Sequence, residues 1–149
     1  MNINDYLITE AGINWARLLA DWIPPLPATF NVWLINRLGE PIVVEPHGAI
    51  VRLDVGMGTS MELARSREEF AQRLDTGDNA NLWLRIGLVD ECRRTGMTLR
   101  PFECYGFRIP PTLGGRYEAV NLRPTRLDIH YSYQAYICKQ TDIYWVPPL

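Results

Sequence analysis

The sequence predicts an α+β fold, in which one antiparallel sheet has helices packed on one side. Three observations predict this class. A central block of short β-prone runs is interrupted by turn residues, apolar residues recur at helical spacing on both sides of that block, and a Pro-Pro pair followed by Gly-Gly ends a further strand. With 149 residues, 47% of them hydrophobic, the chain is expected to form a single domain over residues 1–149.

The first predicted element is a helix over residues 12–22. Its apolar residues recur at helical spacing, with polar residues on the opposite face. Three prolines follow at positions 24, 25 and 27 and are expected to end the helix, because proline lacks the backbone donor that a helix needs. The apolar residues of this helix are Ile13, Trp15, Leu18, Leu19 and Trp22.

Four short strands are predicted next, over residues 30–36, 41–45, 49–54 and 61–64. The breaks between them carry turn residues, at 38–40, 46–48 and 56–59. Short strands with such tight connections indicate an antiparallel meander.

Helical signals return after the meander. Ser66 and Glu69 form a capping box, in which the Ser66 hydroxyl accepts from the Glu69 amide and the Glu69 side chain reaches back. Phe70 supplies the apolar side of this helix, and Gly77 is expected to stop it. A second helix is predicted over residues 81–95, ending at Gly96.

A strand over residues 104–109 is predicted to complete the central sheet and to end at Pro110 and Pro111, which remove two backbone donors. Gly114 and Gly115 follow, and at least one is expected to adopt a backbone conformation that a Cβ disfavours. We interpret the segment as a rigid structural turn and not as a phosphate-binding loop, because it has neither the lysine of a P-loop nor a G-x-G-x-x-G pattern.

The residue pattern of the C-terminal part of the chain fits more than one type of secondary structure. A short extended piece is expected over residues 120–122. The segment 127–138 alternates like a strand from Ile129 but also fits a helix, and we favour a helix from about Tyr131. The tail, residues 145–149, is expected to be an extended arm.

Composition excludes several functional classes. The net charge is −2 and the basic residues are fourteen arginines and one lysine, so no clustered basic footprint for direct nucleic-acid binding is predicted. The three cysteines, Cys92, Cys104 and Cys138, have wide spacings that indicate reduced, buried thiols. Without a signal peptide or a membrane-spanning run, the chain is expected to be cytoplasmic and to have no membrane partner.

One local grouping invites a catalytic interpretation. Asp128, His130 and Ser132 are two residues apart, but on a helix His130 points away from the other two and no directed relay forms. A structural histidine is the favoured interpretation. Cys104 could pair with His130 or His47, yet nothing nearby in the sequence would lower its pKa.

Other candidates for catalysis or metal binding are weaker. The neighbouring acids Glu68 and Glu69, and likewise Asp90 and Glu91, point in different directions on a helix and are interpreted as solvated faces. Two histidines without clustered carboxylates do not predict a zinc site. We therefore predict no catalytic, cofactor-binding or metal-binding residues, and an enzyme is the least favoured hypothesis.

A set of motifs, taken in order, resembles the C-terminal domain family of type VI secretion DNase-immunity proteins. The resemblance covers about residues 13–140 and depends on the order and spacing of the motifs. They are Leu18-Leu19-Ala20-Asp21-Trp22, Leu38-Gly39-Glu40, His47 through Asp54, Ser66-Arg67-Glu68-Glu69-Phe70, Gly87-Leu88-Val89-Asp90, Gly96-Met97-Thr98-Leu99, Cys104 through Gly115, and Asp128-Ile129-His130-Tyr131-Ser132.

The chain departs from the family in two places. The family commonly shows Phe-Gly-Asp where this chain has Leu38-Gly39-Glu40. A Gly-Gln-Ile-His run of the family is replaced here by Ala135-Tyr136-Ile137-Cys138. These differences concern the identity of the partner more than the fold.

The resemblance implies a non-catalytic, cytoplasmic bacterial protein that binds and neutralises a cognate toxin, with a DNase as the expected kind. An acidic patch on the inhibitor could then occupy the basic surface of a nuclease. The alternative hypothesis is a general protein-interaction or adaptor module, and a small-molecule enzyme built on Asp128, His130 and Cys104 comes third. The sequence does not determine the oligomeric state.

Overall fold

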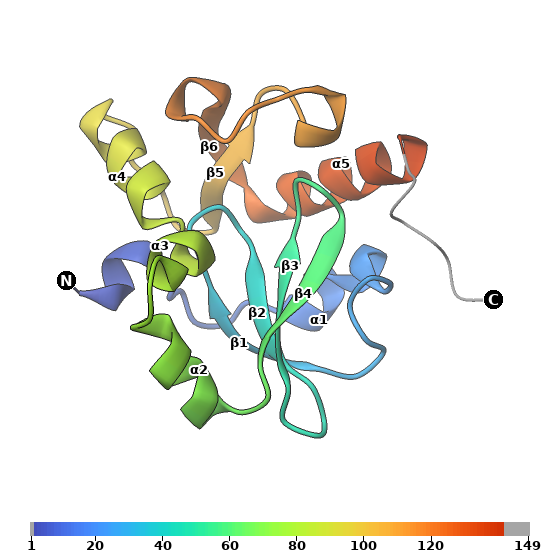
Figure 1. Cartoon of the computed structure of the whole chain (residues 1–149). Coiled ribbons are helices and arrows are strands. Elements are labelled where there is room, and N and C mark those ends of the chain that lie inside the picture. Colours follow the sequence, from blue (N-terminus) through green and yellow to red (C-terminus); the bar gives the residue numbers. More distant parts are fainter. Residues whose placement is uncertain (1, 142–149) are drawn as a thin grey trace.

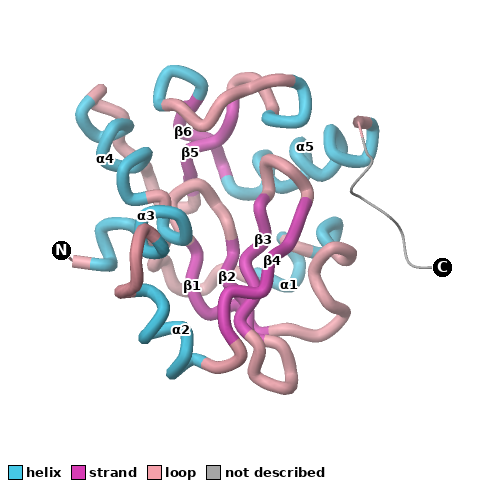
Figure 2. Tube along the Cα trace, viewed as in Figure 1, coloured by secondary structure: helices cyan, strands magenta, loops and turns pink. Residues whose placement is uncertain are grey.

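The computed structural model describes residues 2–141, and its centre is a four-stranded meander (Figures 1 and 2). The strands lie in the order β1-β2-β3-β4 and every neighbouring pair is antiparallel. The three turns between them are those that the sequence predicts. The α+β class and the meander are therefore confirmed. The strand bounds are β1 Asn31–Ile35, β2 Pro41–Val44, β3 Ile50–Asp54 and β4 Thr59–Ala64.

Helices cover both faces of the meander, so the prediction that they pack on one side is wrong. Ile42 and Val43 are adjacent in β2 and therefore point to opposite faces, yet both are fully buried. Ile42 packs with the helices that follow the meander, and Val43 packs with the N-terminal turns and the last helix. The first set is α2 Arg67–Leu74, α3 Asn79–Leu84 and α4 Ile86–Arg94, and the second is α1 Trp15–Leu18, the 3-10 turn η2 Ala20–Trp22 and α5 Leu127–Gln140.

The strand predicted over residues 104–109 exists as β5 (Glu103–Phe107) but lies outside the meander. It pairs antiparallel with β6 (Leu122–Arg126) in a second, two-stranded sheet. Sequence patterning misses β6 because the strand contains Pro124, a residue depleted in strands, and has only one apolar aliphatic residue, Leu122. The two sheets are joined where the Tyr105 amide donates to the Arg37 carbonyl, 2.8 Å away, just beyond the end of β1.

The helix predicted over residues 12–22 is split into α1 and η2. The Asn14 side chain accepts from the Arg17 amide and begins α1, and the backbone changes geometry at Leu19. Buried Trp22 then donates its indole hydrogen to the Tyr131 carbonyl in α5, 3.2 Å away. The helical prediction for 127–138 is confirmed, although α5 begins at Leu127 and not near Tyr131.

The capping prediction at α2 is confirmed in its main part. The Ser66 hydroxyl accepts from the Glu69 amide at 3.1 Å. The Glu69 carboxylate does not reach back to the cap and lies instead 3.4 Å from Arg73 and 3.8 Å from Arg65.

The Pro-Pro and Gly-Gly segment is a rigid turn, as predicted. The 3-10 turn η3 (Pro111–Leu113) ends at Gly114, whose φ is +96°. A Cβ on Gly115 would overlap the Ile109 carbonyl oxygen. The Asn121 side chain stabilises the turn with three hydrogen bonds. It accepts from the Ile109 amide at 2.9 Å and donates to the Ile109 and Arg116 carbonyls.

The expected extended piece at 120–122 belongs to the 3-10 turn η4 (Ala119–Asn121), and extended backbone begins at Leu122. The predicted arm, residues 145–149, lies outside the described residues. The N-terminal 3-10 turn η1 spans Ile3–Tyr6. Within residues 2–141, none of the helices combines the length and the apolar character needed to cross a membrane.

Candidate functional site

Asp128, His130 and Ser132, the three residues that suggest a catalytic relay, all lie on α5, but their side chains do not all point to the same side of the helix. His130 points inward and is buried, whereas Asp128 and Ser132 are exposed. The Asp128 carboxylate pairs with Arg126 at 2.9 Å. The helical placement of His130 away from the other two side chains is confirmed, and no relay of the three side chains forms.

Cys104 and His130 do lie close together. A Cβ placed on Gly39 would be 3.3 Å from the Cys104 sulfur and 3.2 Å from His130 Cδ2. Burial raises the pKa of the Cys104 thiol, and the charge of Glu103 raises it further. Burial also lowers the pKa of His130 to about 4. Both groups are therefore neutral at pH 7, which opposes the thiolate–imidazolium pair that nucleophilic cysteine chemistry requires.

The remaining candidates are not brought together. His47 lies on the exposed β2–β3 turn, 3.0 Å from Glu45. Asp90 on α4 accepts from the Tyr6 hydroxyl at 2.8 Å. Across the described part of the chain, no group of three or more His, Cys, Asp or Glu side chains is arranged to hold a metal ion.

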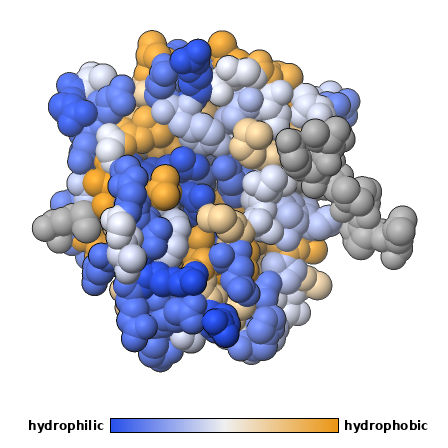
Figure 3. All heavy atoms as spheres, in the orientation of Figure 1, coloured by the Kyte–Doolittle hydropathy of each residue, from blue (hydrophilic) through white to orange (hydrophobic). Residues whose placement is uncertain are grey.

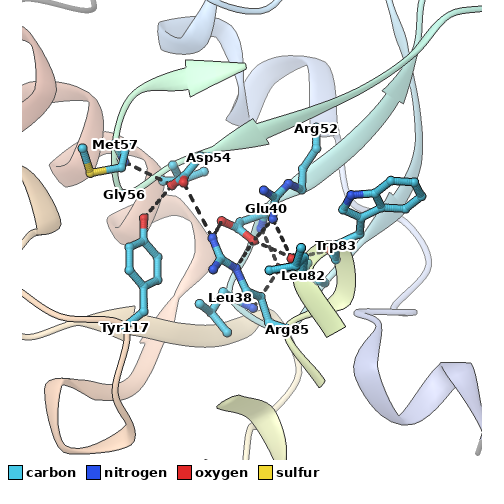
Figure 4. Close-up of polar contacts among 12 residues, drawn as sticks. Leu38, Glu40, Arg52, Asp54, Gly56, Met57, Leu82, Trp83, Arg85 and Tyr117 are labelled. Atoms are coloured by element: carbon cyan, nitrogen blue, oxygen red, sulfur yellow. Dashed lines mark hydrogen bonds and ion pairs between the residues drawn. The ribbon is translucent and has the colours of Figure 1, made fainter. Parts of the chain in front are cut away.

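The most extensive ion-pair cluster of the described residues surrounds Glu40, an almost fully buried residue that directly precedes β2 in the chain (Figure 4). Arg85 donates to it from Nε and from one terminal nitrogen, each at 2.9 Å, in a bidentate ion pair. Asn36 donates at 2.7 Å, and Arg52 from β3 lies 3.3 Å away. This cluster joins the central sheet to the helices on one of its faces.

The backbone at Arg85 explains how its side chain reaches Glu40. The helix predicted over residues 81–95 is interrupted there, because Arg85 adopts φ 55° and ψ 39°, the left-handed conformation that costs a non-glycine residue about 1 kcal/mol or more. This break separates α3 from α4. The carbonyls of Leu82 and Trp83 also accept from Arg52 and Asn36, so the end of α3 is held by the same cluster.

Burial and the neighbouring charges together set the pKa values in this cluster. Burial alone would raise the pKa of Glu40, but the hydrogen bonds and charge of Arg85, with Arg52, hold it below its usual value. Asp54 lies 3.6 Å from Arg85 and accepts from the Tyr117 hydroxyl at 2.7 Å. Burial and the charge of Glu40 raise the pKa of Asp54. Among the described residues every charge in the cluster has an oppositely charged partner, so the cluster stabilises the contact between the sheet and α3.

Sequence reasoning missed this cluster. Glu40 stands between a turn glycine and the apolar run of β2, and Arg85 interrupts the apolar residues Leu84 and Ile86. Charged residues in such positions are unusual unless they are paired. That signal marks both residues, but it does not identify them as each other's partner.

A different feature opens to the surface between α5 and the second sheet. A cavity of about 200 Å³ lies there, with exposed arginines and aliphatic or aromatic side chains around buried polar ones. It is lined by Phe107, Arg108, Arg123, Thr125, Ile129, His130, Tyr133 and Gln134.

Large apolar side chains are exposed around this cavity. Ile129, Tyr133 and Tyr136 follow one another on α5 at spacings of four and three residues and are 55%, 47% and 60% exposed. Ile109 and Val120, in the segment that joins β5 to β6, are also exposed. Figure 3 shows apolar atoms along the upper edge of the molecule, over these connecting loops, and hydrophilic atoms over α2 below. Exposed aromatic and apolar groups of this kind are typical of protein-binding surfaces.

Comparison with known proteins supports the resemblance. Residues 64–136 match the family model described as T6SS immunity protein Tdi1, C-terminal. The match runs from the end of β4 through α2–α4 and the second sheet to Tyr136 in α5, and the earlier motifs at 18–54 lie outside it. Comparison with curated proteins gives no match. Over residues 64–136 this chain is therefore similar to the T6SS immunity protein Tdi1 C-terminal family.

Proposed function

We propose that this protein is a non-catalytic immunity protein that neutralises a cognate type VI secretion toxin by binding it directly in the cytoplasm, and that the toxin is a DNase. The family match over residues 64–136 carries this proposal. The matched region contains α5 and its exposed apolar side chains, which gives the family segment a surface suited to binding another protein.

The chemistry of the described residues agrees with binding. Among the catalytic candidates, Asp128 and His47 are paired, and Cys104 and His130 are buried and neutral. The charges of the Glu40 cluster are paired with one another. A protein that acts by occupying the surface of another protein needs only a rigid scaffold and a complementary face.

The test is co-expression of the chain with the toxin encoded by the neighbouring gene. The proposal expects growth to be rescued from the active toxin, and a catalytically inactive toxin variant to elute with the chain from a gel-filtration column. Nuclease assays with the purified pair should show that DNA cleavage is lost when the chain is added in equimolar amount. Rescue without a stable complex would contradict direct binding, and recovery of regulatory or envelope proteins in place of a toxin would favour the adaptor hypothesis.

A further inference from the structure

Two arginines face the cavity between α5 and the second sheet without an acidic partner. Arg123 pairs with Gly106 across the β5–β6 ladder, and Arg108 stands two residues after Gly106, so both side chains leave the same face. Within residues 2–141, neither guanidinium has an ion pair or a side-chain hydrogen bond, whereas nearby Arg116 and Arg126 are paired. Two unpaired like charges that line the same cavity repel each other and favour the binding of an anion.

The inner wall of the cavity is polar as well. His130 and Gln134 line it from α5, and both are at least 98% buried. Gln134 Oε1 finds no hydrogen-bond partner among the described residues, whereas His130 Nε2 lies toward Gly39 and His130 interacts with the Leu38 backbone. Buried polar groups of this kind are usually satisfied in the functional state of a protein. An ionised carboxylate accepts hydrogen bonds and donates none, so the donor for Gln134 Oε1 would come from a neighbouring group of the entering segment.

The size and rim of the cavity indicate what enters. A volume of about 200 Å³ suits a single side chain and is smaller than the pockets that hold most small-molecule ligands. Ile129 and Tyr133 are about half exposed at the rim and can pack against apolar atoms beside the entering group. Arginine and tyrosine are also the residue types that dominate the binding energy of protein interfaces.

We propose that this cavity receives an Asp or Glu side chain of the toxin, whose carboxylate is held by Arg108 and Arg123 while Ile129 and Tyr133 pack on the neighbouring toxin residues. This inference rests on the proposed toxin-binding function and names the surface that performs it. It also reverses the charge expected from the resemblance, because this face of the immunity protein offers positive groups to an acidic site on the toxin.

A protein carboxylate is favoured over nucleic acid. The chain has a net charge of −2, and the flanking arginines Arg116 and Arg126 are neutralised by Glu118 and Asp128. A backbone-tracking nucleic-acid site needs a continuous basic stripe, whereas Arg108 and Arg123 are two cations at one small cavity.

The decisive experiment compares charge reversals on the full chain. The double variant Arg108→Glu/Arg123→Glu should bind the catalytically inactive toxin roughly 30-fold more weakly or worse, because a carboxylate would then meet two like charges. The matched control is Arg94→Glu, an exposed arginine on α4, which should change the dissociation constant by less than about threefold. Thermal melts of all three proteins should coincide, since neither cavity arginine has a partner to lose. Wild-type affinity in the double variant would overturn the proposal.

A second measurement keeps this inference separate from the proposed function. In amide NMR spectra of the free chain, N-acetylglutamate should shift the Gln134 side-chain signals and the backbone signals of Thr125, while neutral N-acetylglutamine should not. These shifts should vanish in the Arg108→Glu/Arg123→Glu variant. Identical responses to both probes would overturn the cavity as a carboxylate site even if the toxin binds elsewhere.

The remaining outcomes are also distinct. A wild-type chain that fails to bind the toxin but shows the selective shifts would refute the toxin-binding function while supporting the carboxylate site. Binding of a single-stranded oligonucleotide that depends on Arg108 and Arg123 would overturn the choice of a protein carboxylate.

Discussion

The ion pair between Arg85 and Glu40 should be the most sensitive polar interaction of this fold. The perturbation is Arg85→Ala, which removes both 2.9 Å hydrogen bonds and leaves the Glu40 carboxylate, only 1% exposed, with Asn36 and the longer contact to Arg52. Removing one partner of a buried ion pair costs about 3–5 kcal/mol, because the other charge remains desolvated. Domains of ordinary stability unfold at a cost of about 5–15 kcal/mol, so this loss is a large share of the total.

The backbone at position 85 provides a matched comparison. Arg85→Gly removes the same side chain but adopts the left-handed conformation without a Cβ penalty. It should therefore be about 1 kcal/mol less destabilised than Arg85→Ala. The surface control is Arg65→Ala, whose side chain is 85% exposed and lies 3.8 Å from Glu69, and it should lose less than about 0.5 kcal/mol.

The assay is urea unfolding at pH 7, followed by tryptophan fluorescence and circular dichroism. A thermal scan should show a Tm lowered by about 10 °C for Arg85→Ala, given the usual scaling for a chain of this size. Adding Glu40→Gln to Arg85→Ala should cost less than the sum of the two single changes, by at least about 1 kcal/mol, because the two groups interact directly. A loss below about 1 kcal/mol for Arg85→Ala, or an Arg85→Gly variant less stable than Arg85→Ala, would refute this reasoning.

Three further predictions follow from buried or constrained positions. His130 has a pKa lowered by burial from 6.5 to about 4, so the unfolded chain binds the proton more readily, and stability should fall by about 3 kcal/mol as the pH drops through that window. In urea titrations, His130→Asn should remove this dependence and His47→Asn, at an exposed site, should retain it. Gly115→Val should destabilise the domain by about 1–3 kcal/mol or more, because its Cβ would overlap the Ile109 carbonyl. Gly114→Ala should cost about 1 kcal/mol, because only its φ of +96° disfavours a side chain. Equal unfolding midpoints for Gly115→Val and wild type would contradict the structural role of this turn. Ser66→Ala should lower the free energy of unfolding by about 1 kcal/mol, because the cap on α2 is lost, and this should be measured as a lower Tm. An unchanged Tm would show that the cap contributes nothing to stability.

Features that depend on short-range chemistry could be predicted from the sequence. The four meander strands, the Ser66 cap and the structural turn at Pro110–Gly115 are confirmed, because each is specified by residues a few positions apart. The helical form of α5 is confirmed for the same reason, although the helix begins at Leu127, four residues before the predicted start at Tyr131. The family resemblance also came from ordered local motifs, and the family match supports it over residues 64–136.

Features that depend on distant partners could not be predicted. β6 has a poor strand sequence and is extended because β5 lies beside it. The burial of adjacent residues on β2 shows that both faces are covered, yet the sequence does not say which helix covers which face.

The sequence by itself determined the four meander strands, the turns between them, the cap on α2 and the helical form of the C-terminal segment, because propensity, capping and turn chemistry act over a few residues. Only the tertiary structure decided the break at Arg85 and the cavity that contains Arg108 and Arg123. The first exists because a buried carboxylate 45 positions away stabilises Arg85 in an unfavourable backbone conformation. The cavity exists because α5 packs across β5 and β6, whose pairing cannot be predicted from the sequence. Three separate segments form this surface, so no single segment predicts it.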